Sequence, residues 1–139
     1  MADARVLISV RVPAELEAVR LLGQELRKAC EQAGMSEAAA FEIELAMVEA
    51  ANNIVIHGYA GREGAEIGMD VRVEHGAMEV ALTDTGSPIP AEAIAQTGAV
   101  GDDSEHGRGI AIILAFVDSM DYRSSDGFNR LLLRKALAS

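Results

Sequence analysis

The chain has 139 residues, of which half are hydrophobic and 24% charged, so it indicates one globular domain over residues 1–139. Twelve Lys and Arg against 22 Asp and Glu leave a formal net charge of −10, which argues against binding to nucleic acids or anionic membranes. The single cysteine, Cys30, excludes an intrachain disulfide, and neither a membrane span nor a secretory signal is expected. These features predict a cytoplasmic protein, and the scarcity of aromatic residues predicts an aliphatic core.

The N-terminal half predicts one strand followed by two helices. Val6–Val12 is rich in β-branched residues, and apolar positions recur at helical spacing over Ala14–Ala33. Ser36 is a suitable N-cap for a second helix, which we expect to run to about His57, where Gly58 ends it.

The C-terminal half predicts two hairpins separated by a long connection and a third helix. The first hairpin pairs Glu66–Glu74 with Met78–Leu82 around His75-Gly76. A loop over Thr85–His106 follows, with a possible short helix at Ala91–Ala95, and then a helix marked by Ile110, Ile113, Leu114 and Val117. The last hairpin pairs Ser119–Ser124 with Phe128–Arg134 around Asp126-Gly127. The sum is an α+β fold: a two-layer α/β sandwich with a mostly antiparallel sheet of about five strands and three helices on one face.

The second helix carries an unusual polar stripe. Glu49, Asn53 and His57 lie four residues apart and therefore share one helix face. A solvated stripe is the simpler interpretation, but the neighbouring turns are almost wholly apolar, which favours a stripe facing a cleft. Asn inside a helix is otherwise unfavourable, because its side chain competes for backbone hydrogen bonds.

Two further motifs are weak individually. Asp84 ends an apolar strand two residues before Gly86, a pattern that also fits a simple turn former or cap. Gly107 and Gly109 flank Arg108 where the third helix is expected to open, after the long loop. Glycines at a helix N-terminus allow the backbone and the helix dipole to approach a phosphate.

Taken together, the three motifs resemble the N, G1 and G2 boxes of the Bergerat ATP-binding fold, which gyrase and histidine kinases share. The resemblance covers nearly the whole chain. The string EAANNIVIHGY looks most like the bacterial anti-sigma-factor serine kinases, which are stand-alone domains of about this length. A histidine-kinase ATPase domain is disfavoured, because it would normally follow a helical dimerisation segment.

The resemblance implies a role for each motif residue. Glu49 would be the general base toward a serine hydroxyl, and Asn53 would offer its amide oxygen to Mg²⁺. Asp84 would accept a hydrogen bond from the adenine amino group and so select ATP over GTP, while Gly86 would let the base approach.

Phosphate binding would fall to Gly107 and Gly109, with the long loop closing over the nucleotide. Arg108 points either to phosphate or to solvent, and His57 is either part of the site or a helix cap. Asn129 would replace the threonine that relatives often place beside the pocket. Acidic residues stand where relatives often carry an arginine before the two glycines.

The implied function is that of an anti-sigma factor. It would sequester an RNA polymerase sigma factor and use Mg-ATP to phosphorylate a serine of a STAS-domain anti-anti-sigma protein. The family is typically a homodimer, formed through the first strand and first helix. The alternative is a module that binds ATP and its partners with weak or no kinase activity.

Overall fold

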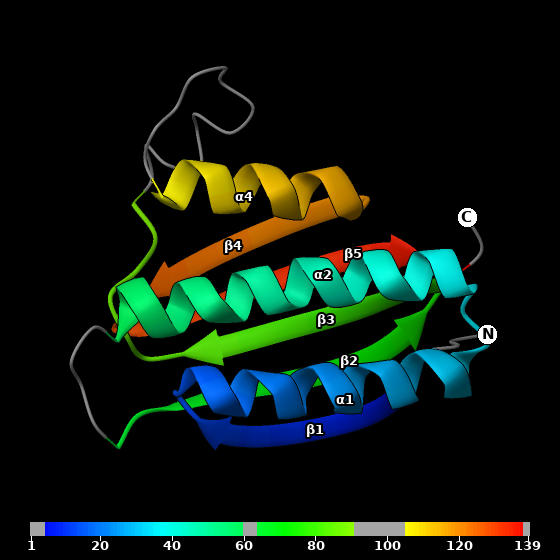
Figure 1. The fold of residues 1–139 in the computed structure, drawn as a ribbon, viewed down its shortest axis with the longest axis horizontal. Coiled ribbons are helices and arrows are strands. Elements are labelled where there is room, and N and C mark those ends of the chain that lie inside the picture. Colours follow the sequence, from blue (N-terminus) through cyan, green and yellow to red (C-terminus); the bar gives the residue numbers. More distant parts are fainter. Residues whose placement is uncertain (1–4, 60–63, 91–104, 138–139) are drawn as a thin grey trace.

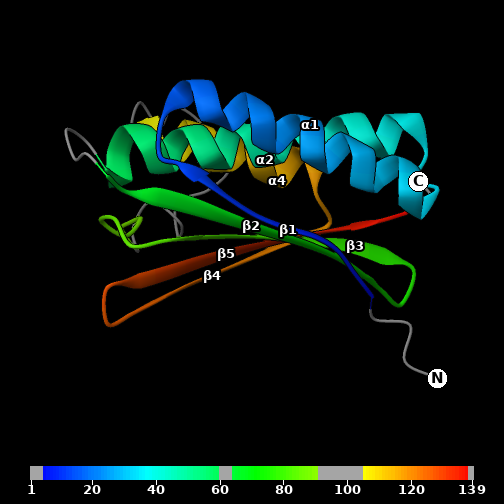
Figure 2. The same ribbon diagram turned by 90° about the horizontal axis from the view of Figure 1, so that it is seen from below.

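The computed structural model describes residues 5–59, 64–90 and 105–137, which form two layers. A five-stranded sheet forms one layer, and helices α1, α2 and α4 lie together on one of its faces (Figures 1 and 2). The elements are β1 (Arg5–Pro13), α1 (Leu16–Ala33), α2 (Glu37–Asn53), η1 (Ile54–Gly58), β2 (Glu66–Glu74), β3 (Ala77–Asp84), α4 (Glu105–Phe116), β4 (Ser119–Ser125) and β5 (Phe128–Ala136). The predicted fold class is confirmed.

The strand order is β1-β2-β3-β5-β4, and each neighbouring pair is antiparallel. Both predicted hairpins form around their predicted turns. His75 and Gly76 have φ angles of 55° and 73°, and Asp126 and Gly127 have φ angles of 55° and 78°. Two successive positive φ values are what a tight two-residue turn between twisted strands requires.

The helix ends follow the predicted signals with three differences. Gly34, with φ of 73°, closes α1, and the Ser36 side chain accepts a hydrogen bond from the Ala39 amide at the start of α2. Helix α1 starts at Leu16, two residues later than predicted. The helical path of α2 does reach Gly58, but its last turn, η1, is a wide π-turn. Helix α4 begins at Glu105, so the two glycines lie inside its first turns.

The core is aliphatic, as predicted, and fills the space between the layers. From the sheet it receives Ile67, Met69, Val80, Leu82, Leu131 and Leu133, and from the helices Leu22, Leu26, Ile43 and Met47, all at most 3% exposed. One ion pair also joins the layers, because the buried Lys135 Nζ on β5 lies 3.0 Å from Oε1 of the partly exposed Glu42 on α2. The other face of the sheet carries no described helix (Figure 2).

Most of the loop predicted over Thr85–His106, including the possible short helix at Ala91–Ala95, lies outside the described residues. Within the described ranges, no helix combines the length and apolar character needed to cross a bilayer.

The Cys30 thiol should be unreactive in the folded protein. Its side chain is 1% exposed, lies 3.7 Å from the Met78 sulfur, and has its pKa raised to about 11 by burial. Reaction requires the thiolate, which is then about a thousandth of the population at pH 8. We expect a thiol reagent to label Cys30 at least a hundredfold more slowly, on the order of its thiolate deficit, in native protein than in urea. Equal labelling rates would contradict this burial.

Candidate functional site

The polar stripe of α2 faces the first turns of α4. A Cβ placed on Gly109 would overlap the Asn53 side-chain amide nitrogen and would lie 3.2 Å from Glu49 Oε2. A side chain at position 109 would therefore separate the two helices or displace Asn53. The bare backbone of α4 lets the two predicted motifs meet.

Asn53 is 8% exposed, yet its side chain makes no hydrogen bond with any described residue. The amide is therefore available to a ligand or to water. Glu49, one helical turn earlier, is half-buried and forms no ion pair among the described residues. The two side chains offer oxygen donors of the kind that Mg²⁺ takes in combination with phosphate oxygens and water.

The wide turn η1 connects this stripe to the end of β3. A Cβ on Gly86 would lie 2.5 Å from the Gly58 carbonyl oxygen and 3.0 Å from the Tyr59 ring. The Ser87 amide also donates to that carbonyl at 2.8 Å. Gly86 is thus required for packing against η1, a reason that the sequence does not reveal. π-turns inside helices often mark functional sites.

Asp84 is held by a small network at the end of β3. Its Oδ1 accepts hydrogen bonds from the Gly86 amide at 2.9 Å and from Asn129 Nδ2 at 2.8 Å. Asn129 also donates to the Gly86 carbonyl at 2.9 Å and accepts from the Ser124 hydroxyl at 2.6 Å. The hydrogen bonds to Ser124 and Gly86 fix the orientation of the Asn129 amide, and the amide in turn positions the Asp84 carboxylate.

Burial raises the pKa of the Asp84 carboxyl, and the hydrogen bonds from Asn129 and Gly86 offset part of that rise. Its second oxygen, Oδ2, has no hydrogen-bond partner among the described residues. A buried carboxylate with one oxygen satisfied and one available is suited to accept a hydrogen bond from a ligand.

A narrow cavity joins the helix stripe to Asp84. Its lining residues come from α2, η1, the segment after β3, and strands β4 and β5: Asn53, Ile54, His57, Gly58, Asp84, Ser87, Ile89, Tyr122 and Leu131. The cavity measures about 10 Å³, room for about one water. A larger ligand must move a wall, and the wall formed by Ser87 and Ile89 leads into the predicted loop.

Six of the predicted site residues therefore converge. Asn53 and Asp84 line one cavity, Glu49 and Gly109 adjoin Asn53, and Asn129 and Gly86 hold Asp84. His57 also lines the cavity. Gly107 and Arg108 lie in the first turn of α4, and the position of the Arg108 side chain lies outside the described residues.

Sequence reasoning missed two tyrosines that shape this site. Tyr122 lines the cavity and accepts a hydrogen bond from the Ile89 amide at 2.9 Å, and burial raises the pKa of its phenol. Tyr59 accepts from the Thr85 amide at 2.6 Å and donates to the Glu66 carbonyl at 3.1 Å. Tyr122 alternates within a strand whose apolar signal is weak, so no sequence pattern singled it out.

Known proteins identify the family to which this fold belongs. Residues 12–135 match the family described as the histidine kinase-like ATPase domain. The serine-protein kinase RsbW of Listeria innocua is 27% identical over 141 residues, which span 96% of this chain and 90% of that protein. RsbW of Listeria monocytogenes is similar to the same extent.

Two solved structures share the fold. A Mycobacterium tuberculosis structure of RsbU and RsbW domains aligns with a TM-score of 0.67 at 19% identity, covering 94% of this chain and 33% of that one. A chain of the SiaB-SiaC complex from Pseudomonas aeruginosa aligns with a TM-score of 0.64 at 16% identity, covering 94% and 90%.

The approach of α4 to α2 predicts opposite effects for two glycine substitutions. Both Gly23 and Gly109 lie in helices, where alanine is intrinsically favoured by about 0.5–1 kcal/mol. A Cβ on Gly23 would lie 3.3 Å from the flexible end of Glu44 and at ordinary contact distance, 3.7 Å, from Val48 Cγ2. We expect Gly23→Ala to raise the free energy of unfolding and Gly109→Ala to lower it by about 1–3 kcal/mol, because the new methyl overlaps Asn53. Urea denaturation measures both. Equal stabilisation by the two substitutions would show that α4 does not approach Asn53 closely.

Proposed function

The chain belongs to the family of histidine kinase-like ATPase domains, and on that premise we propose that it binds Mg-ATP and phosphorylates a serine of a protein partner. The observation that carries the proposal is that Asn53 and Asp84 line one cavity, while Glu49 and Gly109 lie next to Asn53. The similarity to proteins named serine-protein kinase supports the choice of serine as acceptor.

Adenine would enter the cavity above Asp84. The free Oδ2 of that carboxylate accepts a hydrogen bond from the exocyclic amino group, and Ile54, Ile89 and Leu131 supply apolar walls for the ring. Guanine presents a carbonyl oxygen at the same position, which a carboxylate repels. The cavity must widen for this, and the segment that carries Ile89 is the wall that moves.

The phosphates would extend from the adenine toward α4. The backbone of Gly107 and Gly109 lies in the first turns of that helix, where the amides and the helix dipole favour negative charge. The Asn53 amide oxygen would serve as a protein ligand of Mg²⁺, which neutralises phosphate charge when bound. Arg108 lies between these two glycines in the sequence and is a candidate phosphate ligand.

Phosphoryl transfer needs a base beside the phosphates. Glu49 would accept the proton of the serine hydroxyl as the serine oxygen forms its bond to the γ-phosphorus. The bond between that phosphorus and the bridging oxygen breaks, and ADP leaves. Most of the rate enhancement comes from positioning and charge stabilisation.

The partners follow from the same similarity. We infer an anti-sigma role, in which this domain sequesters an RNA polymerase sigma factor and phosphorylates a STAS-domain anti-anti-sigma protein. Proteins named RsbW, and the SiaB-SiaC complex as a two-protein assembly on this fold, support the proposal. A homodimer formed through β1 and α1 and a cytoplasmic location belong to the same proposal.

Asp84→Asn should separate ligand binding from stability. The neutral side chain loses the charge-assisted hydrogen bond to adenine, so ATP affinity falls by about tenfold or more. Because burial raises the pKa of Asp84 in the folded state, its ionised form opposes folding at neutral pH. Without nucleotide, the Asp84→Asn variant should therefore unfold at a higher urea concentration than the wild type. That advantage should shrink as the pH falls through the folded pKa of Asp84, where the wild type becomes protonated.

Calorimetric titration with ATP and GTP, together with urea denaturation at pH 7 and at lower pH, measures both effects. Equal affinity of the wild type for ATP and GTP would remove Asp84 from the adenine site. A variant less stable than the wild type at pH 7 would contradict the effect of burial.

Glu49→Gln should abolish transfer and spare binding. The amide keeps the size of the side chain but cannot accept the serine proton, so phosphorylation of a STAS protein should fall by about 10²–10⁴-fold at saturating Mg-ATP. Glu37→Gln, an equal charge change in the exposed first turn of α2, serves as the control and should retain activity. Wild-type transfer by Glu49→Gln would refute the general-base role. A wild-type protein that binds ATP and transfers no phosphate would identify the domain as a binding module.

A further inference from the structure

The face of the sheet without a described helix carries a row of basic residues. Strand pairing places five residues side by side, one on each strand, and paired residues point to the same face. In order across the sheet they are Arg11, Gly68, Thr83, Arg130 and Arg123. Three arginines in one row are unexpected in a chain with a formal net charge of −10.

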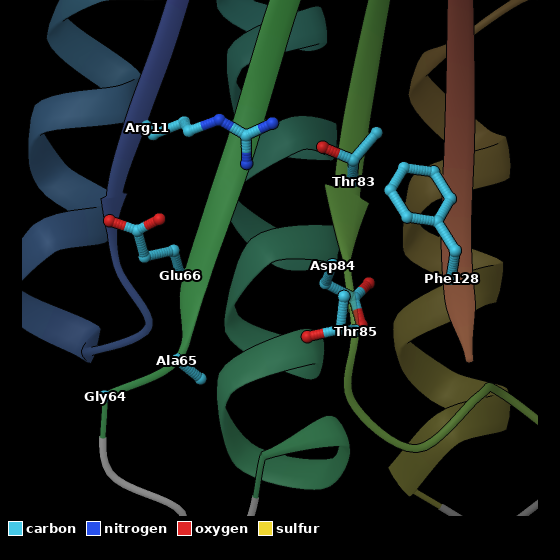
Figure 3. A pocket seen from close by; sticks show the side chains of 8 residues that line it. All are labelled: Arg11, Gly64, Ala65, Glu66, Thr83, Asp84, Thr85 and Phe128. Carbon is cyan, nitrogen blue, oxygen red and sulfur yellow. The ribbon is translucent and has the colours of Figure 1, made fainter.

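A cavity of about 280 Å³ opens beside this row. Figure 3 shows Arg11 reaching from β1 across β2 toward Thr83, with the Phe128 ring on the opposite side and Glu66 below. Phe128 is 49% exposed. The cavity has a cation, a hydroxyl and an apolar ring within one small space, which is the usual make-up of a site for a small polar ligand.

Gly68 forms the floor that lets Arg11 lie flat. A Cβ at position 68 would be 2.6 Å from the Thr83 hydroxyl oxygen and 3.6 Å from Arg11 Nη1. The guanidinium therefore lies directly over this glycine, one strand away from Thr83. Any larger residue at position 68 would push Arg11 and Thr83 apart.

The two arginines on either side of Thr83 lack partners. Neither Arg11 nor Arg130 forms an ion pair or side-chain hydrogen bond with a described residue. Arg130 is also paired across the strands with Arg123, and like charges in directly opposite positions are destabilising. Arg134, four residues further along β5, is by contrast within 3.5 Å of Glu79. Within the row, Arg123 is paired with Asp121 at 3.0 Å, so Arg11 and Arg130 are its two arginines without an ion pair to a described residue.

We propose that this cavity binds a phosphomonoester dianion. Arg11, which lines the cavity, would approach its oxygens from one side of Thr83, and Arg130, the residue paired with Thr83 on β5, would reach in from the other side. The Thr83 hydroxyl would donate a further hydrogen bond, and Phe128 would pack against the group esterified to the phosphate. Two arginines match the double negative charge of a phosphomonoester better than the single charge of a carboxylate ligand. Glu66 lies on the rim and repels the same charge, so it weakens binding without defining the site.

Chemical-shift titration of the ¹⁵N-labelled chain with phenyl phosphate tests the site. We expect saturable shifts at the amides of Gly68, Thr83 and Phe128. Arg11→Gln and Arg130→Gln should each weaken binding by about fivefold or more, the loss of one charge-assisted contact. Glu66→Gln should strengthen it. Arg134→Gln is the matched control, because the same charge is removed about 13 Å along the same strand, beyond one Debye length.

A second titration uses a peptide that bears phosphoserine. Tighter binding of this peptide than of phenyl phosphate would indicate a phosphate carried by a protein, and tighter binding of phenyl phosphate would indicate a small phosphomonoester. Absence of saturable shifts at these amides with both probes would overturn the proposal. Equal weakening by Arg11→Gln and Arg134→Gln would do so as well, since it would indicate attraction by net charge alone.

Discussion

The candidate site depends on how closely two backbones can approach the end of α2. Gly109 brings α4 against Asn53 and Glu49, and Gly86 brings the end of β3 against Gly58. Both contacts leave no room for a Cβ. The two contacts lie at Asn53 and at Gly58, about one and a half helical turns apart. Together they fix the position of the polar stripe of α2 relative to Asp84. The cavity between Asn53 and Asp84 is the direct consequence.

The sheet supports this arrangement from behind. Asp84 and Asn129 are paired across β3 and β5, so their side chains point to the same face and meet in a hydrogen bond. The apolar pairs that follow them, Leu82 with Leu131 and Val80 with Leu133, keep that register, because a slip of one residue would expose the whole set. The polar network at the strand end is therefore positioned by the aliphatic core.

Local chemistry explains what could be predicted from the sequence. Two-residue turns such as His75-Gly76, the period-two alternation of β2 and β3, and the cap at Ser36 are short-range signals that the structure follows. Asn53 and Asp84 stood out because each is polar within an apolar run. Roles that depend on long-range contacts could not be predicted: the Tyr122 hydroxyl accepts from the Ile89 amide across 33 positions, and Gly86, which the sequence did single out, packs against a π-turn that no spacing rule indicates.

Desolvation of Asp84 connects stability to recognition. The carboxylate is 6% exposed and has one oxygen satisfied by Gly86 and Asn129, while burial still raises its pKa. A fully solvated carboxylate would discriminate weakly between ligands, because water would replace whatever hydrogen bond a ligand failed to make. Once a ligand fills the narrow cavity, no space remains for water beside the carboxylate, and a ligand that presents an acceptor leaves two buried acceptors opposed. The same burial that opposes folding therefore gives the site its selectivity for a hydrogen-bond donor.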